Sequence, residues 1–330
     1  QGGGGSGNAT DKGQSYEIAS VTADTITLTG TAELVTETGR AVTLTPIVLD
    51  PTVAGAVITK VIIDQRDDVN LNATGIINVT AGTNAYLGSA TEQLTLNIER
   101  VTAGADVRIK GKYGIVNAAA PGSADVVSGD LILEAGRGFI GSAATPFLIA
   151  LHTDAHLTAR AQNDVYIAEI AGDMNLEGVS SVQGKVVLHS AGSILDALHS
   201  DSAKVAGVRI ELSAANAIGA AGDYLETDMS GAGTLTATAD GNIRLHETFG
   251  DFNVDGIVSV HGDVDLRAHQ SIVDAATAAN DNSGLEDRPG TDISGNNIAL
   301  ISDFGAIGRS GNDLDIDSAY SGAGTLTSSS

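Results

Sequence analysis

Apolar and polar residues alternate in short runs along most of the chain. In Val264-Asp265-Leu266-Arg267-Ala268, for example, every second residue is apolar. A period of two places the apolar residues on one face of a β-strand, whereas a helix requires a period near 3.6. Many of the runs are rich in β-branched residues, which favour strands over helices. The pattern therefore predicts an all-β protein built from short, half-buried strands.

Two motifs follow these runs and alternate strictly along the chain. The first, Ile followed by Val or Leu, Asn or Asp, and Ala, begins at Ile115, Ile194 and Ile272, and the second, Ile-Gly, begins at Ile140, Ile218 and Ile307. The first motif recurs after 79 and then 78 residues. The last copy of the second motif comes after 89 residues, because about ten residues are inserted between residues 276 and 292. Repetition at a fixed long period is typical of solenoid proteins.

A solenoid accounts for both periods. One coil of short strands cannot bury its apolar face alone, but coils stacked ~4.8 Å apart pair their backbones and share a continuous aliphatic core. Parallel crossovers are predominantly right-handed, so we expect a right-handed parallel β-helix, or β-solenoid, with super-repeats of about 78 residues. Each repeat would hold three or four coils, giving roughly 11 to 14 coils over residues 60–330. The six motif isoleucines would form inward ladders, and Asn117, Asp196 and Asp274 would occupy corners.

Composition changes along the chain indicate three regions. Residues 1–14 are glycine-rich and predict a flexible segment. Residues 15–60 alternate irregularly and predict a β cap or irregular first coils, and residues 61–330 predict the solenoid rod. The first residue is Gln1, and no secretory signal opens the sequence. We therefore expect this chain to be an internal slice of a longer fibre, joined end to end with more of the same structure.

Charge and composition narrow the function. The formal net charge is −24, so a phosphate backbone would be repelled and nucleic acid is an improbable partner. No apolar run approaches the ~20 residues of a membrane-spanning helix. There is no cysteine and no tryptophan, and aromatic residues make up 3% of the chain. The core must therefore consist of Val, Ile, Leu and Ala.

Several phrases resemble repeats of very large bacterial exoproteins. They include Gly262-Asp263-Val264-Asp265-Leu266-Arg267-Ala268 and Gly192-Ser193-Ile194-Leu195-Asp196-Ala197. They are similar to repeats of filamentous-haemagglutinin-like surface proteins and giant adhesins, over about residues 105–330. The resemblance implies a secreted or cell-surface β-solenoid that forms rods or fibres and serves attachment or extracellular structure. It supplies no catalytic motif.

Candidate metal ligands are few. The segment containing Asp281, Asn282, Glu286 and Asp287 resembles the start of a calcium loop, but its final glutamate is not correctly spaced. A solvated loop is the simpler interpretation, and calcium is the only cofactor that the sequence suggests. His152 and His156 are four residues apart, a spacing that suits zinc on a helix. On a strand, four residues span ~13 Å, too far for one metal ion.

Three functions remain open. The first is a non-catalytic structural fibre or surface stalk, whose partner would be further copies or a continuation of the same solenoid. The second is an adhesin or carbohydrate-binding rod that contacts cell-surface polysaccharide. The third is a β-helix polysaccharide lyase or hydrolase, which would use carboxylates on one exposed face. Exposed aromatic residues beside carboxylates would favour the second or third function, and a uniform polar shell would favour the fibre.

Overall fold

The computed structural model describes Val69, Leu71 and residues 75–88, 95–275, 291–318 and 323–330, together with the backbone of four strands within residues 15–64. The described residues form an all-β structure without helix. The four early strands, β1 (Ser15–Val21), β2 (Ile26–Leu28), β3 (Thr43–Pro46) and β4 (Lys60–Asp64), form a small antiparallel sheet in the order β2-β1-β4-β3. This sheet includes β4, which lies at the start of the region predicted as rod. The predicted flexible segment, residues 1–14, lies outside the described residues.

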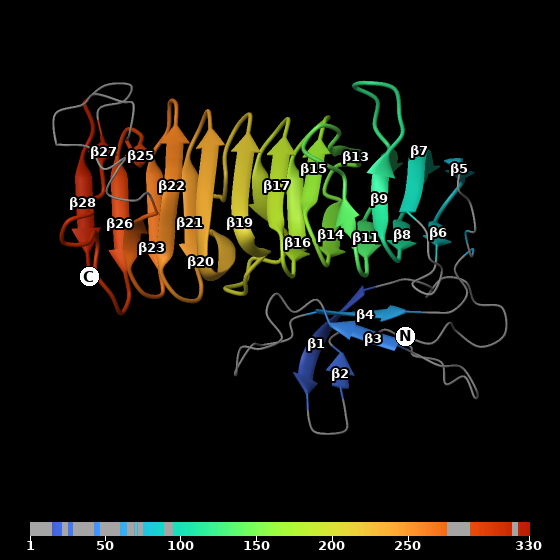
Figure 1. Cartoon of the computed structure of the whole chain (residues 1–330), viewed down its shortest axis with the longest axis horizontal. Helices are drawn as coiled ribbons and strands as arrows, with labels where there is room; N and C mark the ends of the chain where they lie inside the picture. The colour runs from blue at the N-terminus through green and yellow to red at the C-terminus, as the bar shows by residue number, and fades with distance from the viewer. Residues whose placement is uncertain are drawn as a thin grey trace.

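The remaining strands form one continuous parallel sheet, wound as a β-solenoid of about ten turns (Figure 1). Its strands are β5 (Ile76–Ala81), β6 (Ala85–Gly88), β7 (Thr95–Ala103), β8 (Val107–Gly111), β9 (Gly114–Asn117), β10 (Val126–Ser128), β11 (Leu131–Ala135), β12 (Phe139–Ile140), β13 (Phe147–Leu151), β14 (His156–Ala161), β15 (Val165–Glu169), β16 (Met174–Ser181), β17 (Lys185–Ser190), β18 (Ile194–Asp196), β19 (Val205–Ala214), β20 (Leu225–Ala239), β21 (Ile243–Glu247), β22 (Phe252–Ser259), β23 (Val264–Ala268), β24 (Ile272–Asp274), β25 (Ile293–Ser294), β26 (Ile298–Ser302), β27 (Ile316–Asp317) and β28 (Leu326–Ser329). The prediction of a parallel β-solenoid is confirmed.

The sequence repeat corresponds to three and a half turns. Ile115 and Ile272 are two repeats, or 157 residues, apart. Seven successive strand pairings connect their strands, in the order β9-β12-β15-β17-β19-β20-β22-β24. A turn therefore takes about 22 residues, and the intermediate Ile194 lies in the other stack of strands, β8-β11-β14-β16-β18. The structure has fewer turns than the 11 to 14 expected, because loops lengthen several of them; Ile272 pairs with Ile307, 35 residues later.

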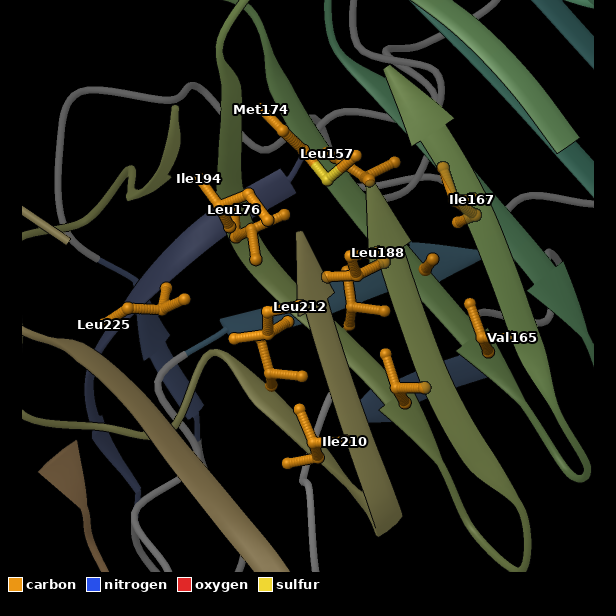
Figure 2. Close-up of a cluster of buried hydrophobic side chains, with 14 of the residues drawn as sticks. Leu157, Val165, Ile167, Met174, Leu176, Leu188, Ile194, Ile210, Leu212 and Leu225 are labelled. Atoms are coloured by element: carbon orange, nitrogen blue, oxygen red, sulfur yellow. The ribbon is translucent and has the colours of Figure 1, made fainter. Parts of the chain in front are cut away.

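Like isoleucines consequently do not lie directly over one another. Each isoleucine of the first motif pairs instead with the next isoleucine of the second motif, in the pairs Ile115–Ile140, Ile194–Ile218 and Ile272–Ile307. Five of the six are fully buried and Ile307 is partly buried. All of them pack in one aliphatic core, where side chains such as Leu157, Leu188 and Leu212 gather between the strands of successive turns (Figure 2).

The first motif marks the place where the chain leaves the sheet. β9 and β10 both pair with the long strand β7, and residues 118–125 between them form a loop. In the same way, β18 and the start of β19 pair with β16, and β24 and β25 pair with β22. Asn117 and Asp196 stand at the start of two of these loops. Each accepts the N–H of the residue two positions later, from Ala119 at 2.9 Å and Leu198 at 2.6 Å.

Other corners are held by serine, glycine and acidic residues. The Ser259 hydroxyl donates to Gly241 O of the preceding turn at 2.8 Å and accepts the Gly262 N–H at 2.9 Å. A Cβ on Gly262 would lie 2.5 Å from Asn242 N, so the corner requires glycine. Asp164 accepts the N–H of Lys185 one turn later at 2.9 Å. Some of the acidic side chains therefore accept hydrogen bonds from backbone N–H groups of the next turn.

Candidate functional site

An aromatic cluster lies at one corner of three successive turns. Phe249 follows β21, His269 follows β23 and Phe304 follows β26, and these strands are neighbours in the sheet (Figure 1). The Phe249 and His269 rings are nearly parallel, with centroids 6.4 Å apart and an interplanar angle of 11°. The His269 and Phe304 centroids are 5.0 Å apart at 66°. Phe249 is 51% exposed and Phe304 is 78% exposed, so the cluster faces solvent.

The outward face of the same strands adds polar groups beside these rings. Arg267 on β23 binds Asp303, with Nε 3.2 Å from both carboxylate oxygens and Nη2 3.1 Å from Oδ1. His246 on β21 is paired with Arg267 in the sheet register and packs edge-on against Tyr224, with centroids 6.0 Å apart. We call the whole set the aromatic face. It consists of Tyr224, Arg244, His246, Phe249, Asp265, Arg267, His269, Asp303 and Phe304.

Two titratable groups of the aromatic face, Tyr224 and His246, have pKa values shifted in favour of their neutral forms. Burial, the nearby charge of Asp265 and a hydrogen bond to it raise the pKa of Tyr224 to about 12, so its hydroxyl remains a donor. Burial lowers the pKa of His246, and the positive charge of Arg267 lowers it further. One carboxylate oxygen of Asp265, Oδ1, is buried and has no hydrogen-bond partner among the described residues.

A second group of buried charged residues lies at the end of the loops that follow the first motif. Asp125, Lys204 and Asp292 each precede the strand on which the chain returns to the sheet, and each donates its backbone N–H to the next turn. Burial raises the pKa of Asp125 to about 7, although the Leu148, Ala119 and Ala118 N–H groups oppose the shift. For Asp292, burial and then the charges of Asp274 and Asp315 raise the pKa to about 7, against a hydrogen bond from the Asp315 backbone.

At the second of these loops the buried charges are compensated. Lys204 is fully buried, and its Nζ lies 3.2 Å from Asp196 Oδ2 and 3.8 Å from Glu226 Oε2. The ammonium also donates to Ser200 O at 2.8 Å and to Ser202 O. Burial raises the pKa of Glu226 to about 8, against the opposing charge of Lys204. Because these groups are closed off from solvent and bonded to the loop backbone, their role is to hold the loop.

The residues considered as metal ligands in the sequence, including the two histidines judged too far apart to share an ion, lie in different places. Asp281, Asn282, Glu286 and Asp287 lie outside the described residues. His152 lies in a tight turn, where the Ala155 N–H donates to His152 O at 3.0 Å, and is exposed. His156 contacts Glu177 at 3.3 Å. Within the described ranges, no group of three or more His, Cys, Asp or Glu side chains is arranged to hold a metal ion.

Sequence reasoning missed the aromatic face. His246 and His269 do not recur at the repeat spacing, so the repeat pattern gives no reason to select them. Phe249 and Phe304 follow the same position of β21 and β26, but the insertion after β24 places them 55 residues apart. One signal in the sequence could have indicated the site. Phe249 and Phe304 each lie just beyond the end of a strand with alternating polarity, and aromatic residues are rare in this chain, which has only eleven Tyr and Phe.

Comparisons with protein-family models, curated proteins and solved structures found no match. In the described part of the chain, no helix has the length and apolar character needed to cross a bilayer. What the protein does must therefore be inferred from its own geometry.

Proposed function

We propose that the chain is a non-catalytic rod segment of an extracellular structural fibre or cell-surface stalk, of the filamentous-haemagglutinin-like kind that its repeats resemble. The observation that carries this proposal is the continuous aliphatic core shared by about ten parallel turns. Adding repeats of this type lengthens the rod without requiring new kinds of contact, because each turn contacts only its neighbours.

The last strand offers a route to end-to-end assembly. Among the described residues β28 pairs only with β26, and Leu326 is 51% exposed. An exposed strand edge with unpaired N–H and C=O groups is a template for another strand. We infer that a further copy of the solenoid pairs with this edge.

The distribution of titrating carboxyls supports a non-catalytic role. Strong pKa shifts often mark active sites, but here the strongest are on buried residues. Glu247 is fully buried, and burial raises its pKa well above the usual value while Thr227 Oγ1 donates to it at 2.8 Å. Asp125 and Glu226 are likewise buried, so none of these three carboxyls can meet a polysaccharide.

Blocking the outward edge of β28 tests assembly. Ile298 N–H donates to Thr325 O at 2.8 Å, so Thr325 and Thr327 face β26 and the Ser328 N–H points away from it. Electron microscopy and light scattering over a concentration series should show end-to-end rods. Ser328→Pro should shorten them, because proline lacks the N–H, whereas Ser328→Ala should not. Single rods at every concentration would overturn the assembly proposal.

A binding role is a second candidate, because the aromatic face sets exposed rings beside carboxylates. Such a rod would act as an adhesin that contacts cell-surface polysaccharide.

A further inference from the structure

We propose that the aromatic face binds a neutral oligosaccharide. The site is formed by the outward side of β21, β23 and β26 and by the corner that follows them. This inference goes beyond the rod function, and it does not depend on end-to-end assembly, since its residues lie on the side of the solenoid.

The spacing of the rings fits an extended ligand with flat apolar surfaces. Phe249, His269 and Phe304 form a row along three turns, with centroid separations of 6.4 and 5.0 Å. Strands in a sheet are ~4.8 Å apart, which is close to the length that one pyranose ring occupies in a glycan chain. The C–H faces of neighbouring sugars can therefore pack on the nearly parallel Phe249 and His269 rings and on the exposed Phe304 ring, whose plane is inclined by 66° to that of His269. Contiguous exposed apolar surface often marks a binding site, and Phe249 and Phe304 are 51% and 78% exposed.

The neighbouring polar groups suit sugar hydroxyls. The Arg267 guanidinium is held in place by Asp303, yet its side chain is 42% exposed and keeps N–H groups at the surface. The Asp303 carboxylate beside it is 22% exposed and supplies acceptor oxygens. A few fixed donors and acceptors beside apolar surface are typical of small-ligand sites. Sugar hydroxyls, which both donate and accept, can meet both groups.

Local charge selects against charged ligands. The aromatic face carries two arginines, Arg244 and Arg267, and two aspartates, Asp265 and Asp303, so its formal charge is balanced. The whole chain has a net charge of −24 and repels polyanions. Nucleic acid bases could also stack on the rings, but the phosphates would meet this negative field. A neutral glycan has the stacking faces without the charge.

Other exposed apolar residues do not offer the same arrangement. Val182 and Val208 are 45% and 42% exposed, but they are aliphatic and present no flat ring. Tyr113 is 38% exposed and lies beside Lys112, whose Nζ is 5.7 Å from its ring centroid. Tyr113 is therefore a matched control for a single exposed aromatic residue.

Binding can be measured by calorimetry and by proton NMR with cellohexaose, chitohexaose and mannohexaose, and with hexagalacturonate as the acidic comparison. The chain has five Phe and no Trp, so changes in the Phe ring signals can be followed individually. We expect at least one neutral hexasaccharide to bind, with little dependence on salt. Phe304→Ala should weaken this binding at least ten-fold, and Phe249→Ala with Phe304→Ala should abolish it. Tyr113→Ala should have no effect.

Melting curves establish that the variants fold, and Phe304 should be dispensable for folding because it is largely exposed. The proposal is overturned if no neutral hexasaccharide binds at millimolar concentration, if only hexagalacturonate binds, or if both Phe substitutions leave binding unchanged. Self-association of the wild-type protein that Phe304→Ala removes would also overturn it, because a second copy would then occupy the aromatic face. Rods that assemble but bind no glycan would refute this inference alone.

Discussion

Two ion pairs on the outward side of the same stack of strands differ in burial. Lys110 on β8 and Glu134 on β11 are 3.1 Å apart, and each side chain is 8% exposed. Arg267 on β23 and Asp303, which follows β26, are also 3.1 Å apart, but their side chains are 42% and 22% exposed. The strands pair in the same parallel manner in both regions.

The difference shows that the outward side of the solenoid serves two purposes. A buried pair must stay intact, because removing one partner leaves a charge without water or a counterion. A half-exposed pair contributes little to stability, since water screens it, and it remains accessible to a ligand. The inward side is the same aliphatic core in both regions.

The largest expected effect comes from the core that the two regions share. Ile194→Asp would place an unpaired carboxylate at a fully buried position and should lower the free energy of unfolding by about 4 kcal/mol or more. Leu195→Asp in the same strand should cost much less, because Leu195 points outward and is partly exposed. Denaturant titrations of both variants measure the contrast. Equal midpoints for Ile194→Asp and the wild type would contradict the inward placement.

The next effect separates the two ion pairs. Glu134→Ala should destabilise the protein by about 3–5 kcal/mol, because it removes a carboxylate that lies 3.1 Å from the buried Lys110 ammonium. Asp303→Ala should cost about 1 kcal/mol or less, because Arg267 reaches water. Lys110→Met combined with Glu134→Leu should recover most of the lost stability, since neither side chain is then charged. Similar losses for Glu134→Ala and Asp303→Ala would remove the distinction between the regions.

The fold was predictable because its signals are local and repeated. Alternation in runs such as Val264-Asp265-Leu266-Arg267-Ala268 fixes strands, and two spacings of 79 and 78 residues fix a repeat. The number of turns per repeat was not predictable. Ile115 stacks on Ile140, and Ile140 on Val165, so any aliphatic residue can fill a core position, and the sequence does not distinguish neighbouring turns.

The aromatic face was hidden for a different reason. Its residues are 20 and 35 positions apart at the corner, from Phe249 to His269 and from His269 to Phe304, because the insertion lengthens one turn. A periodic signal cannot reveal a site formed from unequal turns. Only the strand pairing, with His246 beside Arg267 and Ala268 beside Ser302, brings the residues together.

The last effect concerns the loops, where the two regions should behave alike. Asp125 and Asp292, in different repeats, both have a pKa raised by burial to about 7. In the unfolded chain aspartate titrates near pH ~4. Between pH ~4 and ~7 the folded state therefore binds more protons than the unfolded state, and stability should fall as pH rises through this window.

The expected slope is at most about 1.4 kcal/mol per pH unit for each group. Denaturant midpoints at pH 5 and pH 7.5 would measure it, with higher stability expected at pH 5. Asp125→Asn should flatten the dependence by removing one titrating group, and Asp292→Asn should do so equally, because both close the same type of loop. Stability that increases from pH 5 to pH 7.5 would contradict the prediction and would show that the buried loop carboxyls are ionised in the folded protein.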